Sequence, residues 1–395
     1  LVLLNFDSGP IKAFAVTMII GILSSMFTAL FMTRFFFSKW IENPNHKQLN
    51  MLNWFKTKDF NFFKYAKLAL FLSFFVILIG SFMLIAQRNT IFGMDFRGGY
   101  ALTVELTPNT ENNYRQSVEK ALTYAGAANN EVQIRELTPH NQVRIFLSRS
   151  LQEEGHPFVN LPLEYPLKES NYPYQTNPKI VWVVQSLEKS GISLTPSSLQ
   201  TLNKQWTEVS GQLSDTMRNN ALIGISIAML CILIYITIRF EFNYAISAIL
   251  CLAHDLFFTL SAIAILHKLH IPIQIDLNTI AALMTIIGYS LNDTIIVFDR
   301  IREDMQFMRK MSLIDIMNHS LNVTLSRTLM TSGTTLLVLV PLLFLGGSTL
   351  FGFSLVMVIG VIFGTLSSLF IAAPLMKFFY EWELQKLSKM KLNER

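Results

Sequence analysis

Seven long apolar stretches constrain this chain more than any other feature of its sequence. A helix that crosses a bilayer needs about 20 consecutive, mostly apolar residues. The segments that meet this length are 12–33, 68–86, 219–238, 244–266, 277–298, 325–345 and 351–374. Hydrophobic residues make up 51% of the 395 residues and charged residues only 15%, which is too apolar for a soluble globular domain. The sequence therefore predicts a polytopic α-helical membrane protein.

The first residues give no sign of a secretory signal. The chain begins at Leu1 in a short apolar run, and segment 12–33 follows without the basic region or small-residue cleavage site of a signal peptide. We therefore expect the sequence to be the C-terminal part of a longer polypeptide.

Basic residues in the short connections predict the orientation of the spans. Seven Lys or Arg residues lie in 34–67, four in 299–324 and five in 377–395, against one in 267–276 and none in 346–350. All the basic-rich connections fall on one side of the seven-span arrangement, which the positive-inside rule makes cytoplasmic. The C-terminus is then cytoplasmic, and the long connection between the second and third spans lies on the outer side.

That connection, residues 87–217, has the pattern of a small folded domain. Strand-like runs occur at 101–106, 132–137, 143–148 and 202–209, and helical runs at 111–125 and 180–189. The resulting β-α-β-β-α-β order is typical of a ferredoxin-like α+β domain. Residues 150–178, rich in Pro, Asn and Tyr, are expected to be a loop insertion.

The first and last apolar segments resemble each other, as repeated units of transporters do. At an offset of 339 positions, Phe14, Met18, Ile20, Gly21, Leu30 and Phe31 recur as Phe353, Met357, Ile359, Gly360, Leu369 and Phe370. The shared composition of apolar helices is the alternative explanation.

Ionisable residues inside the apolar stretches are the candidate functional groups. An Asp or Arg at the centre of a membrane helix costs about 2.5–3.5 kcal/mol on insertion scales, so each calls for a partner or a role. These residues are His254 and Asp255 in the fourth segment, Asn292 and Asp293 in the fifth, and Arg327 in the sixth.

Asp293 and Arg327 are expected to form a buried pair. Asp293 lies about five residues, or roughly 7–8 Å, inside the predicted cytoplasmic end of its helix, and Arg327 lies near the cytoplasmic start of the next one. A movement that changed their separation would switch the carboxyl group between proton uptake and release. The alternative is a static pair that fixes helix packing, with Arg327 extending to the interface.

No metal, disulfide or nucleic-acid site is indicated. Cys231 and Cys251 both lie in apolar stretches and are expected to be small core residues. No basic run with interleaved aromatic residues is present in the sequence.

Several motifs resemble the SecD/SecF family. Residues 93–99, GMDFRGG, resemble the G-x-D-F-x-G-G signature that opens the outer domains of this family. Residues 287–303, IGYSLNDTIIVFDRIRE, closely resemble the SecF signature. His254-Asp255, the segment 239–241 and the segment 326–328 match as well. Residues 9–31 resemble the last helix of SecD.

The resemblance implies an RND-type helical bundle with one outer domain. Its expected parts are 1–37 as the end of a SecD-like membrane part, 38–67 as a cytoplasmic connector, 68–86 as the first SecF-like helix, 87–217 as a periplasmic domain, 218–376 as a five-helix bundle and 377–395 as a cytoplasmic tail. Asp293 then matches the family's proton-relay aspartate and Arg327 its partner. Asp95, Phe96, Arg97, Gly98 and Gly99 match the junction between outer domain and membrane, where the glycines suit a tight turn.

The activity that the resemblance implies is assistance to protein export in the bacterial inner membrane. The driving force would be the proton motive force, with protons as the coupling ion, no cofactor and no hydrolytic site. The implied partners are the SecYEG channel, SecA, YajC, YidC, the translocating preprotein, membrane lipid and the missing SecD-like half, which holds the rest of any proton path.

Two other functions have to be weighed against this one. An RND-type exporter of small molecules or lipids would require larger outer domains than the one expected here. An intramembrane aspartyl protease could use Asp255 and Asp293 as acid and base, but the Gly-x-Gly-Asp pattern of such enzymes is missing around Asp293.

Overall fold

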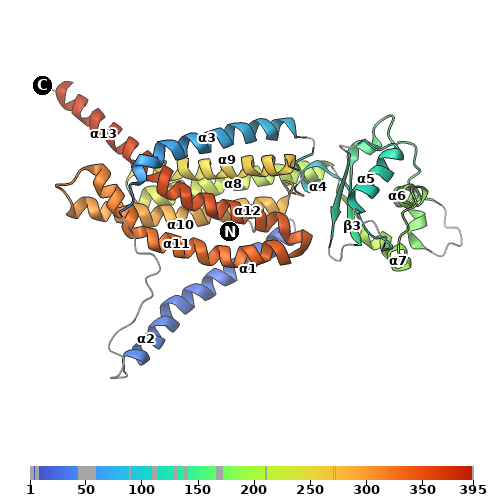
Figure 1. Ribbon diagram of the computed structural model, residues 1–395, viewed down its shortest axis with the longest axis horizontal. Coiled ribbons are helices and arrows are strands. Elements are labelled where there is room, and N and C mark those ends of the chain that lie inside the picture. Colours follow the sequence, from blue (N-terminus) through green and yellow to red (C-terminus); the bar gives the residue numbers. More distant parts are fainter. Residues whose placement is uncertain are drawn as a thin grey trace.

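The computed structural model of the protein describes residue 4 and residues 9–42, 59–88, 90–108, 114–128, 131–137, 141–165, 172–209, 211–269, 271 and 273–393. Figure 1 shows a long helical bundle joined at one end to a smaller α+β domain. We call the end of the bundle next to this domain the domain end, and the other the opposite end. The polytopic α-helical fold with one α+β domain is confirmed.

Seven helices in the described part of the chain are long and apolar enough to span a membrane. They are α1 (Gly9–Phe27) with α2 (Thr33–Ile41), α3 (Phe62–Ala86), α8 (Gly211–Arg239), α9 (Phe242–Lys268), α10 (Leu277–Phe307), α11 (Leu313–Leu345) and α12 (Gly347–Ser367) with α13 (Ala373–Asn393). Each contains one predicted apolar segment or most of it. Several of the helices extend well beyond the predicted apolar segment, because their backbone hydrogen bonds continue into the polar residues that follow.

The centre of the bundle is made by α9, α10 and α12. Small residues allow these helices to approach closely: a Cβ atom on Gly360 of α12 would overlap the side chain of Ile286 on α10. In contrast, α1 and α2 lean away from the bundle (Figure 1) and leave most of their large apolar side chains exposed.

The first and last spans share a local irregularity as well as a sequence pattern. A π-helical segment, η2 (Thr28–Met32), joins α1 to α2, and a second one, η5 (Ser368–Ala372), joins α12 to α13. Short π segments are rare in helices. Their occurrence at nearly the 339-residue offset favours the internal repeat over chance similarity.

The α+β domain has the strand order β2-β3-β1-β4, with all neighbours antiparallel. Its elements are β1 (Gly99–Glu105), α5 (Tyr114–Tyr124), β2 (Val132–Glu136), β3 (Gln142–Ser148), α6 (Pro178–Lys189), α7 (Pro196–Gln205) and β4 (Trp206–Val209). This is the ferredoxin-like arrangement. Helices α5 and α6 lie on one side of the sheet (Figure 1).

Two details of this domain differ from the sequence prediction. The fourth strand begins only at Trp206, because α7 occupies the first half of the predicted run, started by Pro196 and capped by Thr195, whose hydroxyl accepts the N–H of Ser198. The predicted helix 111–125 begins at residue 114, and residues 111–113 lie outside the described part. The insertion contains η3 (Arg149–Gln152) and η4 (Pro173–Thr176).

A short segment before β1 connects the domain to the bundle. Phe92 pairs with Ile275 in an isolated parallel bridge, in which the N–H of Gly93 donates to the carbonyl of Ile275 at 2.8 Å. After the single turn α4 (Met94–Arg97), Gly98 and Gly99 have φ angles of 71° and 134°. A side chain is disfavoured at both positions.

Candidate functional site

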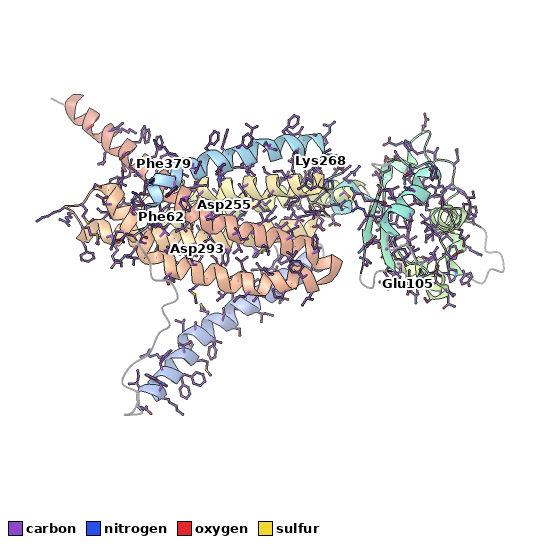
Figure 2. All side chains as sticks on the ribbon, in the orientation of Figure 1. Phe62, Glu105, Asp255, Lys268, Asp293 and Phe379 are labelled. Carbon is purple, nitrogen blue, oxygen red and sulfur yellow. The ribbon has the colours of Figure 1, made fainter. Side chains whose placement is uncertain are left out.

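Asp293 lies on the buried face of α10, where it meets α11. The residue is 1% exposed, and its carboxylate accepts long hydrogen bonds from two hydroxyl groups of α11, Thr331 Oγ1 at 3.4 Å and Ser332 Oγ at 3.5 Å. The Ser332 hydroxyl is also 2.6 Å from the Thr365 hydroxyl of α12. Asp293, labelled in Figure 2, is therefore bound directly by hydroxyl groups of α11, and through Ser332 it is linked to α12.

Arg327 does not pair with Asp293, so the predicted contact is wrong. Its side chain is exposed on the surface of α11, and none of the ion pairs among the described residues joins it to an acid. Asn292 is likewise exposed, about 100° around α10 from the buried Asp293.

The register of α10 against α11 explains the difference. Side-chain contacts between these helices include Ser320 with Asp304, Thr331 with Asp293 and Thr335 with Tyr289, and Ser332, next to Thr331, also contacts Asp293. In an antiparallel pair of helices, residues at the same level have numbers with a constant sum. The sum is 624 for each of the pairs 320/304, 331/293 and 335/289, so these three contacts belong to one register. In that register Arg327 lies level with Val297, four residues or about 6 Å along the axis from Asp293. Counting from the ends of the apolar runs did not reveal this offset.

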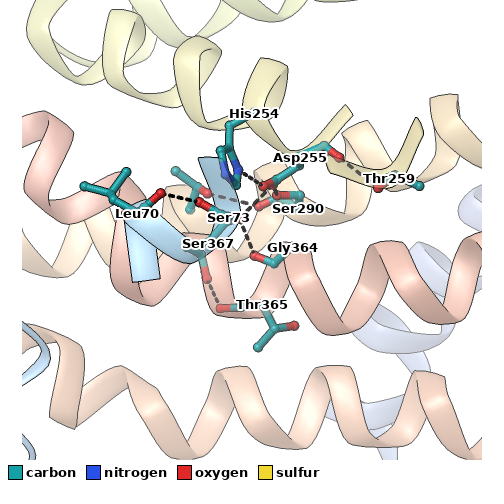
Figure 3. A network of polar contacts seen from close by, with 11 residues as sticks. Leu70, Ser73, His254, Asp255, Thr259, Ser290, Gly364, Thr365 and Ser367 are labelled. Carbon is teal, nitrogen blue, oxygen red and sulfur yellow. Dashed lines mark hydrogen bonds and ion pairs between the residues drawn. The ribbon is translucent and has the colours of Figure 1, made fainter. Parts of the chain in front are cut away.

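Asp255 is the centre of a second buried polar cluster, midway along α9 (Figure 3). The residue is 3% exposed, and its carboxylate accepts hydrogen bonds from Ser290 Oγ of α10 at 2.5 Å and Ser367 Oγ of α12 at 2.8 Å. The other carboxylate oxygen is 3.2 Å from Nδ1 of His254. Nε2 of His254 is buried and has no partner among the described residues.

The two clusters share helices α10 and α12. Ser290 lies three residues before Asp293 on α10, and Ser367 lies two residues after Thr365 on α12. Small polar side chains therefore run between the two carboxylates along both helices. The structure brings Asp255 and Asp293 into one polar region of the bundle (Figure 2), although among the described residues no hydrogen bond joins the two carboxyl groups directly.

A third buried carboxylate in the helical bundle, Asp304, is not among the candidates predicted from the sequence. It is 2% exposed, forms an ion pair with Arg300 at 2.9 Å and accepts a hydrogen bond from Ser320 of α11 at 2.7 Å. The signal was available, because Arg300 and Asp304 have the i,i+4 spacing of a helical ion pair and Arg300 belongs to the SecF-like motif. Asp304 lies beyond the apolar run, however, where an acidic residue is ordinarily expected to be exposed to solvent.

The residues of the GMDFRGG motif meet at the junction. Oδ2 of Asp95 accepts the backbone N–H of Leu277, the first residue of α10, at 3.0 Å. Burial raises the pKa of the Asp95 carboxyl group, against the opposing effect of this hydrogen bond. Phe96 is buried in the bundle core, and burial lowers the pKa of the half-buried Arg97 guanidinium. The described residues contain no group of three or more His, Cys, Asp or Glu arranged for a metal ion.

Comparison with known proteins gives consistent matches. The family model described as "Protein export membrane protein SecD/SecF, C-terminal" matches residues 191–382. The protein translocase subunit SecF of Thermodesulfovibrio yellowstonii is 35% identical over 312 residues, which cover 78% of this chain and 90% of that protein. The protein translocase subunit SecF of Rhodothermus marinus is 41% identical over 193 residues, 49% of this chain and 61% of that protein.

Longer relatives match over nearly the whole chain. The protein translocase subunit SecDF of Thermus thermophilus is 30% identical over 374 residues, 94% of this chain but 45% of that protein. A crystal structure of SecDF from the same organism, described as a translocon-associated membrane protein, matches with a TM-score of 0.76 and 27% identity over 96% of this chain and 46% of that one. The chain thus spans about half the length of SecDF.

Proposed function

Since the chain belongs to the SecD/SecF family of protein-export membrane proteins, we propose that it is an auxiliary subunit of the Sec translocase that uses the proton motive force to promote protein export. The observation that carries the proposal is the site of Asp293, a carboxyl group buried between α10 and α11 that has hydroxyl partners and forms no ion pair with any described residue. An ionised carboxylate is costly in such surroundings unless a cation approaches it. Asp293 should therefore hold its proton when no cation is near and release it when a cation approaches.

Arg327 is the cation that would complete this linkage. It lies about one helical turn from the level of Asp293, on the helix that supplies the hydroxyl groups. In the proposed cycle, the protonated Asp293 donates to or accepts from Thr331 and Ser332 while Arg327 stays away. After proton release, Arg327 approaches the carboxylate and forms the ion pair predicted from the sequence.

Asp255 provides a second site on the proposed proton route. It shares α10 and α12 with Asp293, and Ser290 and Ser367 hold its carboxylate from these two helices. His254, which contacts the same carboxylate, offers an exchangeable proton next to it. The rest of the path would lie in the SecD-like half.

Helix α10 connects this chemistry with the outer domain. The helix begins at the hydrogen bond between Leu277 and Asp95 and carries Asp293 further along. A change in the packing of α10 would therefore reach the domain through the Asp95 carboxylate. We propose that the domain is periplasmic, that the C-terminus is cytoplasmic, that the membrane is the bacterial inner membrane, and that the chain has no hydrolytic activity of its own.

The names of the relatives, which are translocase subunits, support association with the Sec translocase only in general. The specific partners that we propose are the ones implied by the sequence resemblance: the SecYEG channel, SecA, YajC, YidC and the preprotein, together with the SecD-like half. The proposed coupling ion is the proton, because the polar region contains carboxyl, hydroxyl and imidazole groups, all of which exchange protons.

The test is Asp293→Asn in the full-length protein, reconstituted with the translocase in vesicles. Asn keeps the size and hydrogen-bonding capacity of the side chain but cannot release a proton, so proton flux and proton-driven stimulation of export should both be lost. Asp299→Asn is the matched control, because Asp299 is exposed on the same helix. Full export stimulation in Asp293→Asn would refute the proposed relay.

A further inference from the structure

A cavity of about 790 Å³ lies at the junction between the α+β domain and the bundle. Its walls come from residues that follow α3, the turn α4, the segment η3 of the domain with its flanking residues, and the first turns of α8. Its volume is within the range of ligand sites. None of the residues proposed above for the proton route lines it.

The walls of this cavity are strongly cationic. Four arginines line it, Arg88, Arg97, Arg149 and Arg218, against only two carboxylate side chains, those of Asp215 and Glu153. Asp215 already forms an ion pair with Arg218 at 3.0 Å. The other three guanidinium groups have no ion pair with any described residue.

Arg97 is the least compensated of these groups. Its side chain is half-buried, burial lowers the pKa of its guanidinium, and it forms no ion pair with any described residue. An anion in the cavity would supply the missing charge. Guanidinium groups bind phosphate through paired N–H donors, so phosphate is the anion that several converging arginines favour.

The height of the cavity favours a phosphate that belongs to a lipid. Arg88 lies two residues beyond Ala86, the last residue of the α3 span, and Arg218 lies about one turn inside the α8 span, which begins at Ser214. These positions are at the domain end of two membrane-spanning helices, where lipid headgroups lie. Phe92 and Phe96 add apolar surface to the wall, which suits the glycerol and upper acyl part of a lipid.

We propose that this cavity binds the headgroup of an anionic phospholipid from the leaflet on the domain side, with Arg88, Arg97 and Arg149 around the phosphate. This site is independent of the proton route, and its occupant would rest against both the domain and the bundle. A bound lipid would thereby stabilise the placement of the domain above α3 and α8.

The test uses the full-length protein in detergent after delipidation. Binding of short-chain (dihexanoyl) phosphatidylglycerol, dihexanoyl phosphatidylcholine and inorganic phosphate is measured separately by calorimetry and by the shift in denaturation temperature. We expect phosphatidylglycerol to bind and phosphatidylcholine to bind at least about tenfold more weakly. Arg88→Gln with Arg149→Gln, both exposed side chains, should weaken phosphatidylglycerol about tenfold or more, since each basic residue near a lipid surface counts for about 1 kcal/mol.

Two further measurements complete the design. Arg97→Gln alone should weaken the same binding, and Arg309→Gln with Lys310→Gln, an equal loss of charge at the opposite end of the bundle, should not change it. Equal binding of phosphate and phosphatidylglycerol would show a site for free anions, and would overturn the proposal. Equal binding of the two lipids, or an unchanged affinity in the Arg88 and Arg149 variant, would overturn it as well. Displacement of the lipid by an acidic peptide at similar concentration would indicate a protein ligand instead.

Discussion

The hydrogen bond between Asp95 and α10 gives a prediction whose size can be worked out from the structure. The first N–H groups of a helix have no partner within it. In α10, Oδ2 of Asp95 accepts the N–H of Leu277 at 3.0 Å, and Asp276 separately accepts the N–H of Thr279 at 2.8 Å. Asp95→Ala therefore leaves one N–H unpaired at the junction and leaves the neighbouring cap in place.

Removal of this hydrogen bond should destabilise the start of α10 by about as much as the loss of a helix cap, about 0.5–2 kcal/mol. Since 1.4 kcal/mol corresponds to a factor of ten, the amide of Leu277 should exchange with solvent roughly 2- to 30-fold faster in Asp95→Ala. Hydrogen exchange with mass spectrometry, on peptides that start before and after Leu277, measures this rate. Asp276→Ala is the control, because it should accelerate exchange at Thr279 without releasing α10 from the domain.

The two variants should also differ in function. On the proposed coupling through α10, Asp95→Ala should reduce proton-driven export more than Asp276→Ala, although both loosen the same helix end. An unchanged exchange rate at Leu277 in Asp95→Ala would show that this hydrogen bond contributes nothing, and would refute the reasoning.

The pKa of Asp95 adds a test with a definite sign. Burial raises it above the ordinary value of 3.8, so the folded junction binds this proton more tightly than the unfolded chain does. The stabilising contribution is then fully present below the unfolded pKa and is lost as the pH rises through the folded pKa. Asp95→Asn is neutral at every pH and should remove this part of the pH dependence. A denaturation temperature measured from about pH 4 to 7 that falls as steeply in Asp95→Asn as in the parent would contradict this.

Two further predictions concern the contact of α10 with α11. Ser320→Ala removes the 2.7 Å hydrogen bond to the buried Asp304. It should lower the free energy of unfolding by about 1–3 kcal/mol, which is measured as a lower denaturation temperature. Thr334→Ala is the control and should have little effect, because this hydroxyl is exposed and bonded to its own helix. Cysteines in place of Tyr289 and Thr335, joined by a short thiol cross-linker, should hold the register of the two helices and still permit proton flux; loss of flux only after cross-linking would show that α11 has to slide.

The predictions that depended on local sequence patterns were the successful ones. The seven spans and the β-α-β-β-α-β order follow from runs and periods within one segment, and backbone hydrogen bonding obeys the same patterns. Segment 202–209 was the exception: its first four residues belong to α7, whose start at Pro196 and cap at Thr195 lie before the predicted run.

The relation between helices was harder to predict from the sequence. Burial of Asp255 and Asp293 could be expected, since an acid in an apolar helix avoids lipid. Their partners could not, because the hydroxyl groups of Ser290 and Thr331 become partners only through the packing of α10 against its neighbours. The same packing decides that Arg327 lies one turn away from Asp293.

That register restricts how Arg327 can approach Asp293 in the proposed cycle. If α11 slid by one turn, about 5.4 Å, the buried hydrogen bond of Ser320 to Asp304 would break, and an acid that already pairs with Arg300 would lose its second partner. The contacts of Asp293 itself, at 3.4 and 3.5 Å, are long and give little resistance. A long arginine side chain can instead span about one turn along its own helix, as it does when it reaches a membrane interface. The geometry therefore favours a swing of the Arg327 side chain, with Thr331 and Ser332 yielding to it, over a sliding helix.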